Sequence, residues 1–149
     1  IWTEESVDFP NGCAVSPDGT RLYIAETIPG AMIEIPINDD GSAGHRRVLF
    51  EMGLPCPDGI AIAENGFLVV SCYRPDTIYV WDVEFGLRIL AEDPRGTVLA
   101  APTNVVFTGD KRDTIVVPNL GRWHLTRFRT SLQGVPLFYP TPGKLGITT

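Results

Sequence analysis

Three short stretches of the 149-residue sequence share one pattern: a proline, a short polar residue and then an apolar run. They are FPNG at Phe9–Gly12, CPDG at Cys56–Gly59 and APTN at Ala101–Asn104. The polar residues of the three stretches are about 46 to 47 positions apart, a spacing typical of repeat architectures. This repeat constrains the fold more than any other feature of the chain, because each unit has to adopt the same supersecondary structure.

Each unit contains four short runs rich in Val, Ile, Leu, Tyr and Phe, separated by Gly, Pro, Asp and Asn. This composition is typical of strands joined by turns. The first two runs of each unit are joined by a tight-turn sequence: Pro17–Gly19, Glu64–Gly66 and Thr108–Asp110. Runs such as MIEIPI at Met32–Ile37 alternate apolar and polar residues, and no segment keeps a helical period. The sequence therefore predicts an all-β fold.

Four antiparallel strands repeated at this spacing are typical of a β-propeller blade, whose first strand lies against the central axis. We predict three four-stranded blades at 9–51, 56–92 and 101–139, followed by a tail at 140–149. Together they would form a single unit, half of a propeller. The composition is that of a globular protein with a core, since 44% of the residues are hydrophobic and 20% are charged.

The net charge of −6 argues against nucleic acid or an anionic membrane surface as a partner. No apolar run approaches the roughly 20 residues of a membrane helix, and no signal-peptide pattern is present. The chain begins at Ile1, so we expect that its N-terminus was cleaved, trimmed or lost from a longer protein. Cys13, Cys56 and Cys72 form no close pair, and we expect buried free thiols, which favours a reducing, cytoplasmic compartment.

Asn11, Asp58 and Asn104 each lie where the chain enters the predicted innermost strand of a unit. Their side chains should therefore converge at the mouth of one central channel. Proline fixes φ just before them, and Gly12 and Gly59 allow a sharp entry into the strand. Two amides and a carboxylate supply hard oxygen ligands, which suit Ca²⁺, Mg²⁺ or Mn²⁺, or Zn²⁺ in an open catalytic site. The alternative is that all three are ordinary turn residues.

The three units resemble the gluconolactonase / senescence marker protein (regucalcin) / luciferin-regenerating enzyme family over about Phe9 to Gly146. The stretches that carry the resemblance are FPNGCAVSPDGTRLYIAET, LPCPDGIAIAENGFLVV and APTNVVFTGDKRDTIVV, which follow one another in the family's order. The resemblance implies a six-bladed propeller that hydrolyses sugar lactones and related esters with one divalent metal ion on its axis. The chain matches only the C-terminal half of that fold.

The resemblance also implies a role for each polar residue of the repeat. Asn11 corresponds to a metal ligand, Asp58 to a metal ligand and catalytic general base, and Asn104 to a residue that lines the axial channel or contacts substrate. The family's other metal carboxylate, a glutamate, belongs to the half of the fold that this chain lacks. Neither Glu4 nor Glu5 lies in the matching context.

Half of a six-bladed ring would leave the outer faces of its first and third blades bare, and such patches mark interaction surfaces. We therefore expect a homodimer that closes the ring; a piece of a longer chain and a distinct partner chain are the alternatives. Two functions stay open. The chain is either a metal-dependent hydrolase of sugar lactones or related esters, or a non-catalytic propeller half that binds or assembles, with structural axial residues.

Two further groups of residues have two interpretations each. Glu26 ends a predicted strand, and it either supports the axial site or only terminates the strand. Arg122, Arg127 and Arg129 form a solvated face, or else a site for an anion or a partner.

Overall fold

The computed structural model describes residues 1–137. In that part the chain forms strands and turns only, which confirms the all-β prediction. It follows that residues 1–137 include no helix long and apolar enough to cross a membrane.

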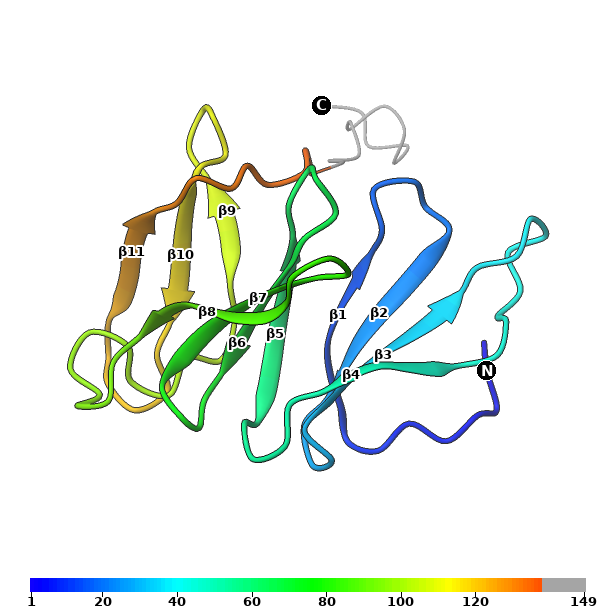
Figure 1. Cartoon of the computed structure of the whole chain (residues 1–149), viewed down its shortest axis with the longest axis horizontal. Helices are drawn as coiled ribbons and strands as arrows, with labels where there is room; N and C mark the ends of the chain where they lie inside the picture. Colours follow the sequence, from blue (N-terminus) through cyan, green and yellow to red (C-terminus); the bar gives the residue numbers. More distant parts are fainter. Residues whose placement is uncertain (138–149) are drawn as a thin grey trace, which may run out of the picture.

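The strands form three antiparallel sheets that follow one another along the molecule (Figure 1). The first contains β1 (Pro10–Val15), β2 (Arg21–Glu26), β3 (Ala31–Pro36) and β4 (Arg47–Glu51). The second contains β5 (Pro57–Ile62), β6 (Leu68–Cys72), β7 (Thr77–Asp82) and β8 (Gly86–Glu92). The third contains β9 (Val106–Thr108), β10 (Thr114–Pro118) and β11 (Leu125–Arg129). Neighbouring strands in each sheet are consecutive in the sequence, as the repeat predicts.

The tight turns after the first strand of each unit are also confirmed. Gly19, Gly66 and Gly109 have φ of +75°, +83° and +86°. This left-handed region is open to glycine because glycine has no Cβ. These turns fix where each second strand begins, and so they fix its register against the first strand of the unit.

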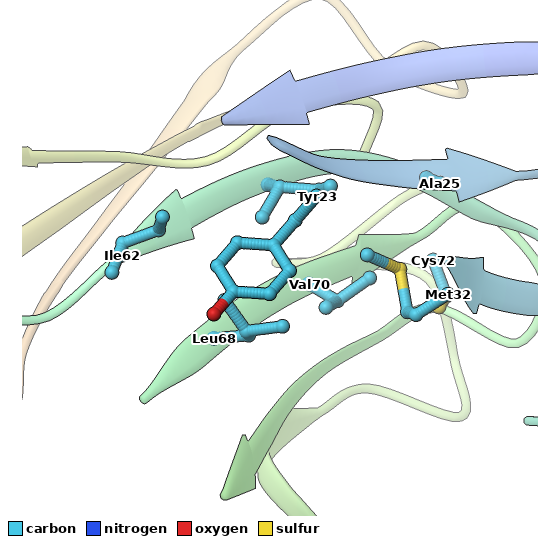
Figure 2. Close-up of a cluster of buried hydrophobic side chains, with 8 residues drawn as sticks. Tyr23, Ala25, Met32, Ile62, Leu68, Val70 and Cys72 are labelled. Atoms are coloured by element: carbon cyan, nitrogen blue, oxygen red, sulfur yellow. The ribbon is translucent and has the colours of Figure 1, made fainter. Parts of the chain in front are cut away.

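The core lies in two layers between the sheets. The layer between the first and second sheets contains Tyr23, Ala25, Met32, Ile62, Leu68, Val70 and Cys72 (Figure 2). The layer between the second and third sheets contains Val69, Ile78, Leu99, Val105, Ile115 and Val117. Every residue of β6 is buried, because alternate side chains of this strand point into the two layers. The middle sheet is therefore packed on both faces.

The outer face of the first sheet is covered, and the expectation that it would be bare is wrong. Three isoleucines on this face are at most 8% exposed: Ile24, Ile33 and Ile35. Val7 of the N-terminal segment packs against them, and the indole Nε1 of Trp2 donates to the carbonyl of Gly41 at 2.8 Å. Residues 1–8 therefore cover much of this face.

The outer face of the third sheet differs. Its apolar side chains include Val106 at 43% and Leu125 at 68% exposure, beside the exposed Arg127 and Arg129. The side chains of β10 and β11 that face the other way, such as Ile115, pack on the second sheet. Within residues 1–137, this outer face remains open to solvent, as expected.

The third unit forms three strands among the described residues, so the prediction of four is wrong at 135–137. That part of the predicted fourth strand leaves the third sheet: the Val135 N–H donates to the Ile62 carbonyl at 3.1 Å, and Gly134 forms a β-bridge with Ala63. The chain thus returns to the far end of β5. Residues 138 and 139 and the predicted tail at 140–149 lie outside the described residues.

The three cysteines are free thiols, as predicted, but only one of them is buried. Cys13 is exposed and Cys56 is half-buried. Burial raises the pKa of the Cys72 thiol, which stays neutral in the core between the first two sheets.

Candidate functional site

Asn11 and Asp58 lie in equivalent β-bulges of two neighbouring strands. The register of β1 against β2 shifts within Pro10–Cys13, and that of β5 against β6 shifts within Pro57–Ile60. Each interval contains one residue more than its partner strand, so the ladder is interrupted at the polar residue. Bulges of this kind aim a side chain out of the regular alternation and are common next to active sites. The two residues therefore lie inside the first strand of their units, one step later than the sequence predicts.

Gly12 allows β1 to approach β5 closely, and Gly59 allows β5 to approach the segment before β9. A Cβ added to Gly12 would lie 2.8 Å from the Gly59 Cα, and a Cβ added to Gly59 would lie 2.5 Å from the Asn104 Cα. Neither glycine has φ in the left-handed region. The requirement for glycine is therefore close backbone approach, and the predicted sharp entry is not its cause.

The Asn11 side chain is held by hydrogen bonds that cross between the two sheets. Its Nδ2 donates to the Thr27 hydroxyl at 3.3 Å, and that hydroxyl donates to the Pro57 carbonyl at 2.7 Å. Pro57 immediately precedes Asp58, so Thr27 connects the two bulges. Thr27 is 4% exposed.

Asp58 is a half-buried carboxyl group whose pKa is raised. Burial is the main cause of the shift, and the hydrogen-bonding Asn11 amide opposes it. Among the described residues, no basic side chain forms an ion pair with Asp58. The Asp58 carboxylate thus lies next to an amide and lacks a cationic partner in this part of the chain.

The backbone that presents Asp58 is fixed by a buried serine. The Gly59 N–H donates to the Ser71 hydroxyl at 3.0 Å, and that hydroxyl lies 3.4 Å from the Gly59 carbonyl to which it donates. Ser71 is fully buried. Its hydroxyl satisfies backbone groups that the interrupted ladder leaves unpaired, which stabilises the bulge.

Asn104 lies beside the pair, but it is not the strict counterpart of Asp58. In the first two units the proline pairs with the end of the second strand, and in the third unit Pro102 pairs likewise with Asn119, just after β10. Thr103 follows that proline directly, and the backbone of Asn104 lies against Gly59. The Asn104 Oδ1 accepts the N–H of Val105 at 2.8 Å, which is a local turn contact. A role for Asn104 in the channel stays a prediction.

Two oxygen donors of the kind that divalent cations prefer are therefore close together: the Asn11 amide and the Asp58 carboxylate. Residues 1–137 contain no cluster of three or more His, Cys, Asp or Glu side chains that could hold a metal ion. The pair fits a hard cation such as Ca²⁺, Mg²⁺ or Mn²⁺ as part of a ligand set, and further ligands are needed to complete the set.

Glu26, one of whose two interpretations is a support for the axial site, is hydrogen-bonded on the outer face of the first sheet. It accepts hydrogen bonds from the Asp8 N–H at 2.8 Å and from Arg46 Nη2 at 2.7 Å. Glu5 is occupied nearby, since its carboxylate contacts His45 Nδ1 at 2.8 Å. These contacts explain why neither glutamate joins Asn11 and Asp58.

A groove of about 280 Å³ follows β1, β5 and β9 beyond the pair. Its walls are largely apolar and include Cys13, Val15, Ile60, Val106, Val135 and Leu137. Since the residues of β1 and β5 that line it follow Asn11 and Asp58 in sequence, the groove begins next to the candidate site and runs away from it.

Sequence reasoning missed Thr27 and Ser71, which hold the bulges. One signal was available for Thr27: it ends the YIAET stretch, and the second strand of a hairpin returns to the level at which the first strand begins. Ser71 lies in a buried apolar run, LVVSC, where a lone hydroxyl has to find a hydrogen-bond partner.

A family model matches most of the chain. The profile of the SMP-30/Gluconolactonase/LRE-like region matches residues 2–119. A 6-deoxy-6-sulfogluconolactonase of Pseudomonas putida is 31% identical over 118 residues, which are 72% of this chain and 36% of that protein. The chain spans about a third of the length of the curated relatives that it matches.

Solved structures show a similar fold. A luciferin-regenerating enzyme superposes with a TM-score of 0.71 at 21% identity, over 85% of this chain and 47% of that one. Regucalcin from Agrobacterium tumefaciens, described as a calcium-binding protein, superposes with a TM-score of 0.67 at 19% identity, over 88% of this chain and 48% of that one. The described sheets therefore have the fold of about half of each protein.

Proposed function

The chain belongs to the SMP-30/gluconolactonase/LRE-like family, and we propose that it is the part of a metal-dependent lactone hydrolase that supplies Asn11 and Asp58. One observation carries the proposal: an amide and a half-buried carboxyl group lie together in equivalent bulges of adjacent strands. The relative that acts on a sulfogluconolactone supports a sugar lactone, or a related ester, as the substrate class.

In this proposal Asp58 is the general base. It accepts a proton from water as the water oxygen forms a bond to the lactone carbonyl carbon, and it returns the proton to the leaving ring oxygen when the ester bond breaks. The product is a hydroxy acid. The raised pKa of Asp58 makes its carboxylate a stronger base than an exposed aspartate. The Asp58 carboxylate and the Asn11 oxygen would hold a divalent cation, and that cation would polarise the lactone carbonyl.

We propose that the ligands missing from residues 1–137 come from the other half of the fold. The described residues bring two oxygen donors together, and the family resemblance implies a glutamate from the other half. In the homodimer proposed below, the other half is a second copy, which would offer a second Asn11 and Asp58 in place of that glutamate. The chain matches 47% of the luciferin-regenerating enzyme, so a second half would be needed to give the whole fold.

A lactone-hydrolysis assay combined with metal analysis of the purified chain tests this function. We expect the chain to bind Ca²⁺, Mn²⁺, Mg²⁺ or Zn²⁺ and to hydrolyse a sugar lactone. A chelator should remove the cation and abolish the hydrolysis. Bound cation without turnover would favour the second candidate, a non-catalytic half with a structural ion. If the purified chain binds no cation and shows no turnover, the hydrolase proposal is contradicted. The second candidate is supported by the small number of oxygen donors among the described residues.

We also propose that the three sheets are adjacent propeller blades, at 9–51, 56–92 and from 101 onward, with β1, β5 and β9 innermost. The contacts of β5 with both β1 and β9 support this arrangement. So do the equivalent bulges in β1 and β5, since repeated distortions are expected where repeats meet a common axis.

For the assembly, we propose a homodimer in which the open face of the third sheet contacts the first sheet of a second copy. The third sheet presents a basic end face, with Arg127 and Arg129 beside Leu125. The first sheet presents an acidic end face, where Asp8, Glu26 and Glu51 surround the single Arg46. The opposite charges favour this contact, and residues 1–8 would form part of it.

Light scattering tests the homodimer. We expect a particle of twice the 16.3 kDa chain mass, and Leu125→Asp should convert it to a monomer because it places a charge on the basic end face. Leu54→Asp is the matched control, since Leu54 is 95% exposed in the loop before β5 and should leave the dimer intact. A stable monomer of the unmodified chain would contradict the assembly.

A further inference from the structure

We infer that Thr27 is a positioning residue that sets the orientation of the Asn11 amide, so that its oxygen faces the candidate site. The inference rests on the proposed function, because it assigns Thr27 a task in holding a divalent cation through Asn11. Thr27 itself is 4% exposed and would not contact the substrate.

The direction of the hydrogen bonds carries the inference. A threonine hydroxyl has one proton, and Thr27 donates it to the Pro57 carbonyl at 2.7 Å. Toward Asn11 the same oxygen can therefore only accept, so the NH₂ end of the amide has to face Thr27, as it does at 3.3 Å. The opposite end of the amide, the Oδ1, then points away from Thr27 and is available as a cation ligand.

Thr27 is itself held firmly. Its N–H donates to the Phe9 carbonyl at 3.2 Å, which fixes the end of β2 against the start of β1. Its hydroxyl reaches the backbone just before Asp58. Thr27 therefore ties both site strands to one point, and a displacement of this side chain would move Asn11 relative to Asp58.

A second threonine in the chain has the same bonding pattern without a site. Thr126 accepts from the Nδ2 of Asn119 at 3.0 Å and donates to the Val98 carbonyl. The Asn119 Oδ1 is used internally, since it accepts the Ala100 N–H at 2.8 Å. Within residues 1–137, the Asn11 Oδ1 accepts no such hydrogen bond. The Asn11 amide therefore has an oxygen available for a ligand, whereas the Asn119 amide has a structural role only.

Calorimetric titration with Mn²⁺ tests the inference in the full chain. Thr27→Val keeps the shape and removes the hydroxyl, and we expect about tenfold weaker Mn²⁺ binding, as for other residues that orient a metal ligand. Thr27→Ser should restore binding to near that of the unmodified chain. Thr126→Val is the matched control, which should lower the thermal stability similarly without changing Mn²⁺ affinity. Unchanged affinity in Thr27→Val would overturn the positioning role.

A measurement on the unmodified chain separates this inference from the proposed function. If the chain binds no Mn²⁺, the metal-site proposal fails, and the orientation of Asn11 is then decided by NMR. We expect nuclear Overhauser contacts between the Asn11 side-chain amide protons and the Thr27 γ-methyl group, and a single slowly exchanging amide orientation. An Asn11 amide without these contacts, or one that rotates freely, would overturn the inference even if Thr27→Val fails to fold.

Discussion

Replacing Asp58 by Asn should abolish both lactone hydrolysis and cation binding while the three sheets stay folded. The substitution preserves the shape of the side chain and removes its charge and its ability to accept a proton. Loss of a general base alone lowers the rate by about 100- to 10,000-fold. The Asn11–Thr27–Pro57 hydrogen bonds do not involve the Asp58 carboxylate, so they should survive.

The same variant should be at least as stable as the unmodified chain at neutral pH without cation. Because the pKa of Asp58 is raised in the folded state, the folded chain binds this proton more tightly than the unfolded chain. Stability from this group is therefore full below the unfolded pKa of Asp58 and is lost as pH rises through the folded pKa. Asp58→Asn removes this pH-dependent loss of stability, because an amide does not ionise. Added Mn²⁺ should stabilise only the unmodified chain.

The pH profile of hydrolysis gives an independent check. Cation binding should weaken as pH drops through the raised pKa that Asp58 has in the cation-free chain, because the protonated carboxyl group does not bind a cation, and hydrolysis should fall with it. Asp18→Asn is the matched control in a turn of the first unit. Hydrogen bonds from Ser16 and Thr20 lower the pKa of Asp18 to about 2, so this variant should lose stability and keep activity. Full activity in Asp58→Asn would reduce Asp58 to a turn residue.

The sheets and their order were predictable from the sequence because both depend on local chemistry. Alternation marks strands such as β3, and glycine at Gly19, Gly66 and Gly109 marks the turns that adopt positive φ. The cover of the first sheet by residues 1–8 was not predictable. It depends on contacts such as Trp2 with Gly41, which join positions far apart in sequence and leave no periodic signal. The return of Gly134 to β5 was missed for the same reason.

The candidate site divides in the same way. The repeat is enough to single out Asn11 and Asp58, because both occupy the same position after a proline in equivalent strands. It misplaced Asn104 by one position, because Thr103 directly follows Pro102 and Asn104 occupies the position that Gly12 and Gly59 have in the other two units. The repeat does not predict Thr27 and Ser71, because neither residue recurs at the equivalent position of another unit. Each forms hydrogen bonds across strands that stabilise the backbone around one bulge.

Gly59→Ala should be among the most damaging single substitutions in the chain. The added methyl group would lie 2.5 Å from the Asn104 Cα, a backbone atom that cannot move aside as a flexible side chain can. Gly59 is buried between the bulge of β5 and the segment that leads into β9. We expect a loss of about 3 kcal/mol in the free energy of unfolding, at the upper end of overpacking costs, measured by urea denaturation.

Gly66→Ala separates close approach from backbone strain. Gly66 has φ of +83° with open space around its Cβ position, so alanine there should cost about 1 kcal/mol through strain alone. Gly12→Ala should resemble Gly59→Ala, because its methyl group would press on the backbone of Asp58 and Gly59. Since Gly12→Ala pushes β1 away from β5, any of this variant that still folds should also bind Mn²⁺ more weakly, whereas Gly66→Ala should bind it normally. Equal stability losses for Gly12→Ala and Gly66→Ala would mean that β1 and β5 do not approach this closely, and the pairing of Asn11 with Asp58 would lose its structural basis.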